Sequence, residues 1–172
     1  MEIGGSTYLY AMAGVAMAFV GFTSIVVSIR QTLGADLSKF QLLLMRILIE
    51  HGFVVVGFAF LPSLLAMFDI SHLVVWRISS FLAAIFIFFW MGYYVWRRYP
   101  AARSKAQPRF AFANYTVAMV AVLALFCNAI GYPFKPQAGV YAAGISWVLF
   151  QAADIFILSF RAFLKPREDV PQ

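Results

Sequence analysis

Five long apolar stretches, separated by short segments rich in polar and turn-forming residues, make up most of the chain. The stretches cover residues 7–29, 40–68, 73–96, 113–131 and 138–164. Each comes close to or exceeds the length of about 20 apolar residues that a helix needs to cross a bilayer. The separating segments contain Gly34, Pro100 and Pro133, which favour turns, and Ser38 is placed to cap the second helix. The pattern therefore predicts an all-α fold, a five-helix transmembrane bundle that forms a single domain over residues 1–172.

The composition leads to the same class of protein. Of the 172 residues, 63% are hydrophobic and only 12% are charged. A soluble domain of this length cannot bury so much apolar surface. We therefore expect an integral, multi-pass protein, and place it in the bacterial cytoplasmic (inner) membrane.

The basic residues predict an orientation, because five spans put the two termini on opposite sides of the membrane. The basic residues on the side of the C-terminus are Arg30, Lys39, Arg97, Arg98, Arg103, Lys105, Arg109, Arg161, Lys165 and Arg167. Outside the spans, only Lys135 falls on the other side. Cytoplasmic loops carry the excess of Lys and Arg. This asymmetry predicts an N-terminus outside and a C-terminus in the cytoplasm.

The densest group of basic residues lies between the third and fourth spans. It consists of Arg97, Arg98, Arg103, Lys105 and Arg109. Positive charge next to a span attracts the anionic headgroups of membrane lipids. We expect these residues to contact lipid headgroups at the cytoplasmic face, with a nucleotide or protein partner as the alternative. No nucleic-acid partner is expected, because the basic residues lie mainly at helix ends.

Three polar residues interrupt the second span, where charge is costly. Arg46 and Glu50 are four residues apart and share one helix face, and His51 follows them. At 1.5 Å per residue, Arg46 lies about 12 Å from the cytoplasmic end of its helix and Asp154 about 15 Å from the end of the last helix. These depths predict a buried cluster of Arg46, Glu50 and Asp154, with His51 or Gln151 as neighbours. Such a cluster would act as a clamp between helices, a path for an ion, proton or solute, or a docking site for another subunit.

The remaining candidate features are a lone charge and two rows of small residues. Arg77 lies in the outer half of the third span, and we expect its guanidinium to extend to the outer interface. Small residues let membrane helices approach closely. On the first and last helices they form the predicted packing seam Ala11, Gly14, Ala18, Gly21, Gly139 and Ala143.

The chain lacks the sequence signals of common catalytic and metal sites. Cys127 is the single cysteine, and His51 and His72 are the two histidines, so we expect no intrachain disulfide and no metal centre. No Gly-rich phosphate loop, nucleophile elbow or zinc-protease motif is present. We therefore expect no cofactor and no enzymatic activity.

Three functions are compatible with these features. The leading hypothesis is a homo-oligomeric channel or transporter for an ion or small solute, with the buried polar cluster on its path. The alternatives are a non-catalytic accessory subunit of a larger membrane complex and a membrane receptor for a hydrophobic ligand.

Overall fold

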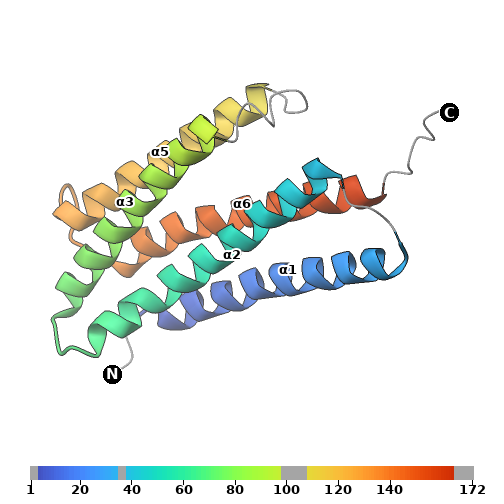
Figure 1. The fold of residues 1–172 in the computed structure, drawn as a ribbon. Helices are drawn as coiled ribbons and strands as arrows, with labels where there is room; N and C mark the ends of the chain where they lie inside the picture. Colours follow the sequence, from blue (N-terminus) through green and yellow to red (C-terminus); the bar gives the residue numbers. More distant parts are fainter. Residues whose placement is uncertain (1–3, 35–37, 98–107, 165–172) are drawn as a thin grey trace.

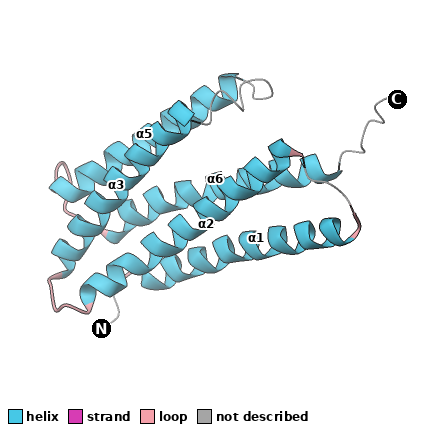
Figure 2. Cartoon of the chain, viewed as in Figure 1, coloured by secondary structure: helices cyan, strands magenta, loops and turns pink. Residues whose placement is uncertain are grey.

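The computed structural model describes residues 4–34, 38–97 and 108–164, and this part of the chain is helical without strands (Figure 2). Its helices are α1 (Ser6–Thr32), α2 (Lys39–Ala66), α3 (His72–Arg97), α5 (Pro108–Ile130) and α6 (Ala138–Leu164). Each predicted span corresponds to one helix, with ends that differ by a few residues. The prediction of an all-α fold built on these five stretches is confirmed.

Within the described residues, four helical segments are long and apolar enough to cross a membrane. They are Ser6–Thr32, Gln41–Ala66, His72–Tyr93 and Ala138–Arg161. The described apolar part of α5, Asn114–Ile130, is shorter. These segments indicate an integral, multi-pass membrane protein. The fifth crossing and the orientation in the membrane stay predictions.

The helices form two groups that meet at one end of the molecule. Helices α1, α2 and α6 pack side by side, and α3 packs along α5 (Figure 1). The α3–α5 pair lies close to α2 and α6 near the turns that join α2 to α3 and α5 to α6, and it diverges from them toward the opposite end (Figure 1). Helix α1 begins at one end of the bundle and α6 ends at the other. The candidate functional site lies between the two groups of helices.

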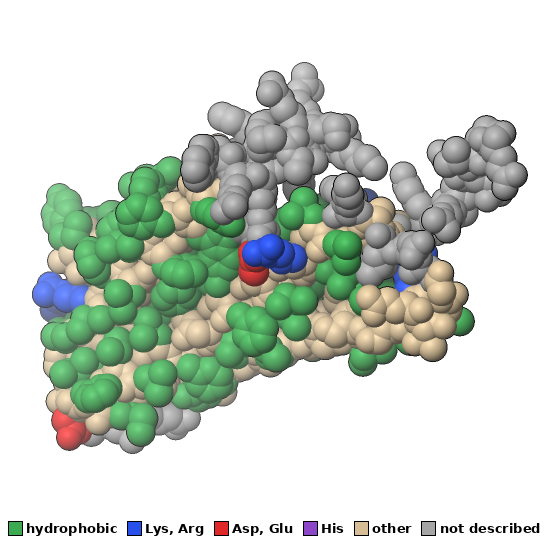
Figure 3. Space-filling view, in the orientation of Figure 1, with side chains coloured by type: hydrophobic (Ala, Val, Ile, Leu, Met, Phe, Trp, Pro, Cys, Tyr) green, Lys and Arg blue, Asp and Glu red, His purple; other side chains and the backbone are tan. Residues whose placement is uncertain are grey.

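The outer surface of the bundle is mainly apolar, as Figure 3 shows for one face. Phenylalanine, isoleucine and leucine side chains such as Phe89, Ile25 and Leu123 point outward and are exposed. The buried positions between helices hold smaller side chains together with a few large ones, such as Ala16, Ala84 and the fully buried Tyr141. This arrangement suits a lipid environment, in which outward apolar side chains face acyl chains instead of water.

Helix α2 begins and continues through specific hydrogen bonds. Ser38 caps it as predicted: the Gln41 backbone N–H donates to Ser38 Oγ at 3.2 Å, and the Ser38 backbone N–H donates to Gln41 Oε1 at 2.9 Å. Further along α2, Pro62 has no N–H to donate to the carbonyl of Phe58. The hydroxyl of Tyr141 on α6 donates to that carbonyl instead, at 2.6 Å. The proline is therefore tolerated because a neighbouring helix supplies the missing donor.

The predicted packing seam does not form the contacts between helices of this chain, because all of its residues are exposed; its use in contacts between copies or with another subunit stays a prediction. They are Ala11, Gly14, Ala18, Gly21, Gly139 and Ala143. The close helix contacts use other glycines. A Cβ on Gly52 would lie 2.4 Å from Val20 Cγ2, and one on Gly144 would lie 2.9 Å from the side chain of Leu125. Helix α1 has small residues on more than one face, and the face that is buried follows from the position of α2.

Candidate functional site

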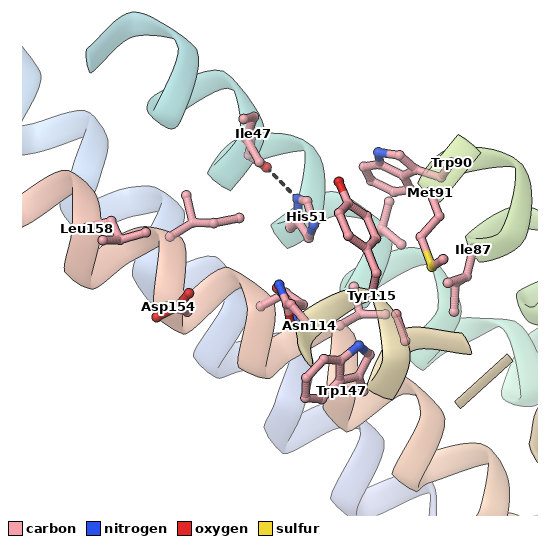
Figure 4. Close-up of a pocket in the computed structure, with 15 residues that line it drawn as sticks. Ile47, His51, Ile87, Trp90, Met91, Asn114, Tyr115, Trp147, Asp154 and Leu158 are labelled. Atoms are coloured by element: carbon pink, nitrogen blue, oxygen red, sulfur yellow. Dashed lines mark hydrogen bonds between the residues drawn. The ribbon is translucent and has the colours of Figure 1, made fainter. Parts of the chain in front are cut away.

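A cavity of about 280 Å³ lies where α2 and α6 face the α3–α5 pair. Its polar and aromatic lining residues are His51, Trp90, Asn114, Tyr115, Trp147, Gln151 and Asp154. They come from different helices: His51 projects from α2, Trp90 from α3 and Asp154 from α6 (Figure 4). We call this cavity the polar pocket.

Two amide side chains join α5 to α6 in the polar pocket. Asn114 Nδ2 donates to Gln151 Oε1 at 2.6 Å, and Gln151 Nε2 donates back to Asn114 Oδ1. Each amide carries two N–H groups and two lone pairs on its oxygen, so this reciprocal pair uses half of the hydrogen-bonding capacity of each side chain. The pair can hold the two helices together and still offer donors and acceptors to a ligand.

His51 has a fixed orientation at the edge of the polar pocket. Its Nδ1 lies 2.8 Å from the carbonyl oxygen of Ile47, one turn earlier in α2 (Figure 4). A carbonyl oxygen can only accept, so Nδ1 carries the hydrogen and Nε2 has the lone pair in the neutral ring. The imidazole also packs against Trp90, with ring centroids 5.2 Å apart. The sequence predicted His51 or Gln151 as a neighbour of the cluster that contains Asp154, and all three residues line this pocket.

Asp154 supplies the formal charge of the polar pocket. Its side chain is half-buried on α6, and the described part of the chain provides no hydrogen bond or ion pair to it. Among the described lining residues there is also no Lys or Arg. Arg161 follows two turns later on the same helix, about 10 Å further along the axis. A carboxylate is thus held inside the bundle without a counter-ion in the described lining.

The predicted cluster of Arg46, Glu50 and Asp154 is wrong, because Asp154 lines the polar pocket and Arg46 and Glu50 do not. Arg46 Nε donates to Glu50 Oε1 at 2.8 Å within α2, and the two side chains are 69% and 30% exposed. Figure 3 shows one such pair of opposite charges in the middle of the apolar face. Successive helical residues are rotated by about 100°, so His51 points into the polar pocket while its neighbour Glu50 lines a different surface. The sequence predicted that Arg46 lies near Asp154 because both have a similar depth along their helices. The rotation of α2 about its axis instead turns Arg46 away from the polar pocket.

Glu50 lines a long groove between α2 and α3 that the sequence did not predict. The groove has a volume of about 1060 Å³ and is lined mainly by apolar side chains, including Phe53, Phe86 and Phe89. Trp90 borders both the groove and the polar pocket.

Polar contacts also close the opposite end of the bundle, where α3, α5 and α6 meet. The fully buried Asn128 donates from Nδ2 to Ser80 Oγ at 2.8 Å and to the Gln137 carbonyl at 3.1 Å, and its Oδ1 accepts from the Gln137 backbone N–H at 3.0 Å. Arg77 is exposed, and its Nη2 donates to the Ile130 carbonyl at 3.4 Å. A guanidinium at the C-terminus of α5 also complements the helix dipole. The predicted extension of Arg77 to the outer interface stays a prediction.

The predicted basic loop lies outside the described residues. Arg98, Arg103 and Lys105 belong to the segment 98–107, and the side chains of Arg97 and Arg109, in α3 and α5, are also outside the description. Their contact with lipid headgroups stays a prediction.

Comparison of the chain with protein-family models, with curated proteins and with solved structures finds no match. The function must therefore be argued from the polar pocket itself.

Proposed function

We propose that this protein is a transporter for a small solute that binds in the polar pocket. The observation that carries the proposal is the convergence of His51, Asn114, Gln151 and Asp154 on one cavity between apolar helices. Ionisable groups inside a membrane are costly and mark binding sites or pathways when they face a cavity. Asp154 meets this description, because it lines the cavity and no described residue makes an ion pair with it.

The packing beyond the pocket favours a transporter over an open channel. Between the polar pocket and the end where the helices meet, the core contains fully buried residues such as Val55, Ala84 and Tyr141. Trp76 and Tyr141 pack there with ring centroids 5.6 Å apart. A solute that crosses this layer would need the helices to move. The two groups, α1–α2–α6 and α3–α5, are suited to such a movement because they diverge at the other end.

The pocket is proposed to open to the cytoplasm. His51, Asn114 and Asp154 lie about 18, 9 and 15 Å along their helices from the ends at Lys39, Pro108 and Leu164. These are the ends near which the basic residues gather in the sequence, and the excess of positive charge favours a cytoplasmic location. The predicted homo-oligomer is a separate proposal.

Cysteine accessibility tests this function. Ala118 is buried, lines the polar pocket and belongs to α5. An Ala118→Cys variant, in a Cys127→Ser background, would report whether water-soluble thiol reagents reach the pocket. Val120, exposed on the apolar outer surface of the same helix, provides the matched control, because a Val120→Cys thiol should face lipid and react slowly.

The vesicle experiment separates the candidate functions. A transporter predicts labelling of the Ala118→Cys variant from the cytoplasmic side in inside-out vesicles, and slower labelling from the outside in right-side-out vesicles. Labelling from one side only would favour a receptor or an accessory subunit. If the pocket thiol is no more reactive than the Val120→Cys control from either side, the pocket does not admit solutes and the proposal is wrong.

A further inference from the structure

We propose that the solute bound in the polar pocket is a small organic cation, a protonated amine or a quaternary ammonium ion. This inference rests on the proposed function and adds the chemical class of the ligand. It assigns the counter-ion to Asp154 and the aromatic contacts to Trp90, Tyr115 and Trp147.

The charge of the pocket is the first argument. Asp154 brings one negative charge into a cavity whose other described lining residues include no Asp, Glu, Lys or Arg. Surrounded by apolar helices, this charge is screened less than it would be in water. A monovalent cation would neutralise the carboxylate, whereas an anion would be repelled by it.

The aromatic rings are the second argument. Trp90, Tyr115 and Trp147 all border the cavity, each from a different helix (Figure 4). Phe150 stacks on Trp147 with ring centroids 5.5 Å apart and an interplanar angle of 22°, which fixes the indole and directs its other face away from Phe150. The faces of Trp and Tyr attract organic cations, and several such rings around one site are typical of ammonium recognition.

The same lining disfavours a bare metal ion. Calcium takes six to eight oxygen ligands, and magnesium is bound through carboxylates and retained water. Within the described residues, no group of three or more His, Cys, Asp or Glu side chains is placed to hold a metal. Most of the other lining residues, such as Ile87, Val148 and Trp147, have apolar or aromatic side chains that supply no oxygen ligand.

The volume limits the size of the ligand. A cavity of 280 Å³ corresponds to about nine water molecules at 30 Å³ each. The ligand therefore has on the order of ten non-hydrogen atoms, and benzyltrimethylammonium is a suitable probe.

The first test compares two thiol reagents on the Ala118→Cys variant in the Cys127→Ser background. One reagent, trimethylammonium-ethyl methanethiosulfonate, is a cation, and the other, sulfonatoethyl methanethiosulfonate, is an anion. After normalisation to a free thiol in solution, we expect the cation to react about tenfold faster than the anion, because a charged site concentrates ions of opposite sign. Asp154→Asn should remove most of this preference, and Asp154→Glu should restore it.

Glu50→Gln is the matched control, because it removes a carboxylate from the same chain but outside the polar pocket. It should leave the ratio of the two rates unchanged. Using a ratio also cancels any effect of a substitution on the reactivity of the thiol itself.

The second test measures binding by isothermal titration calorimetry on purified protein in lipid nanodiscs. Benzyltrimethylammonium should bind saturably, and at least about tenfold more tightly than benzyl alcohol or benzoate. Asp154→Asn should abolish this preference while Glu50→Gln retains it.

The outcomes distinguish the two proposals. Equal reaction rates for both reagents, or equal binding of the cation, the alcohol and the anion, would overturn the cation assignment and leave the transporter proposal standing. Absence of any reaction at the pocket thiol would overturn both. A preference for the cation that survives Asp154→Asn in a folded protein would also overturn the assignment to Asp154.

Discussion

Replacing Tyr141 by phenylalanine removes a single hydroxyl, and its effect should depend on a proline in another helix. Pro62 leaves the Phe58 carbonyl without the i+4 donor that it would have in a regular helix. The Tyr141 hydroxyl, 2.6 Å away, is the donor from α6. Tyr141 and Pro62 are both almost completely buried, so water is not at hand to replace the lost bond.

Two known ranges of free energy limit the destabilisation that we expect for Tyr141→Phe. Hydrogen bonds between membrane helices contribute about 0.6 kcal/mol on average, with a maximum of about 1.7 kcal/mol. A buried acceptor left without a partner costs about 1–3 kcal/mol. Because Pro62 removes the usual alternative donor, Tyr141→Phe should cost an unfolding free energy where these ranges overlap, at about 1–1.7 kcal/mol.

A double-mutant cycle with Pro62→Ala tests the cause of this cost. The alanine restores a backbone N–H at position 62, which can donate to the Phe58 carbonyl. In that background Tyr141→Phe should cost about 0.6 kcal/mol or less, so the coupling between the two positions should be near 1 kcal/mol. Unfolding of the four proteins by sodium dodecyl sulfate, followed by circular dichroism, gives the required free energies. An equal cost in both backgrounds would show that the tyrosine does not compensate for the proline.

Other substitutions test the packing and the charges. Gly52→Ala places a Cβ against Val20 and should destabilise the protein by about 1–3 kcal/mol. The control is Gly57→Ala, in open space on the same helix, which should be neutral or stabilising by up to about 1 kcal/mol. An equal decrease in the melting temperature of both variants would refute the contact between Gly52 and Val20. Asn128→Ala removes the three hydrogen bonds of a buried side chain and should cost about 2–3 kcal/mol in the same detergent unfolding. Asp154→Asn should leave the melting temperature unchanged or raise it, since no described residue makes an ion pair with the carboxylate; a clear decrease would indicate a structural ion pair.

The sequence determined the helices and the depth of each residue along them. The length of each apolar stretch and the turn-forming residues between stretches are local properties, so five helices and the Ser38 cap followed directly. Depth is also local, because each residue advances a helix by 1.5 Å. Depth suggested a cluster with His51 or Gln151 beside Asp154, and all three residues line the polar pocket.

Only the tertiary structure decided which face of each helix meets which neighbour. In a soluble protein, the polar face of a helix reveals its rotation, but in a membrane helix both the lipid-facing and the protein-facing sides are apolar. Arg46 therefore seemed a partner for Asp154 and Gly14 a contact of another helix, whereas Glu50 pairs with Arg46 along α2 and Gly52 makes the close approach to α1. The rotation of each helix is set by the fit of side chains against its neighbours, and that fit depends on residues far apart in the sequence.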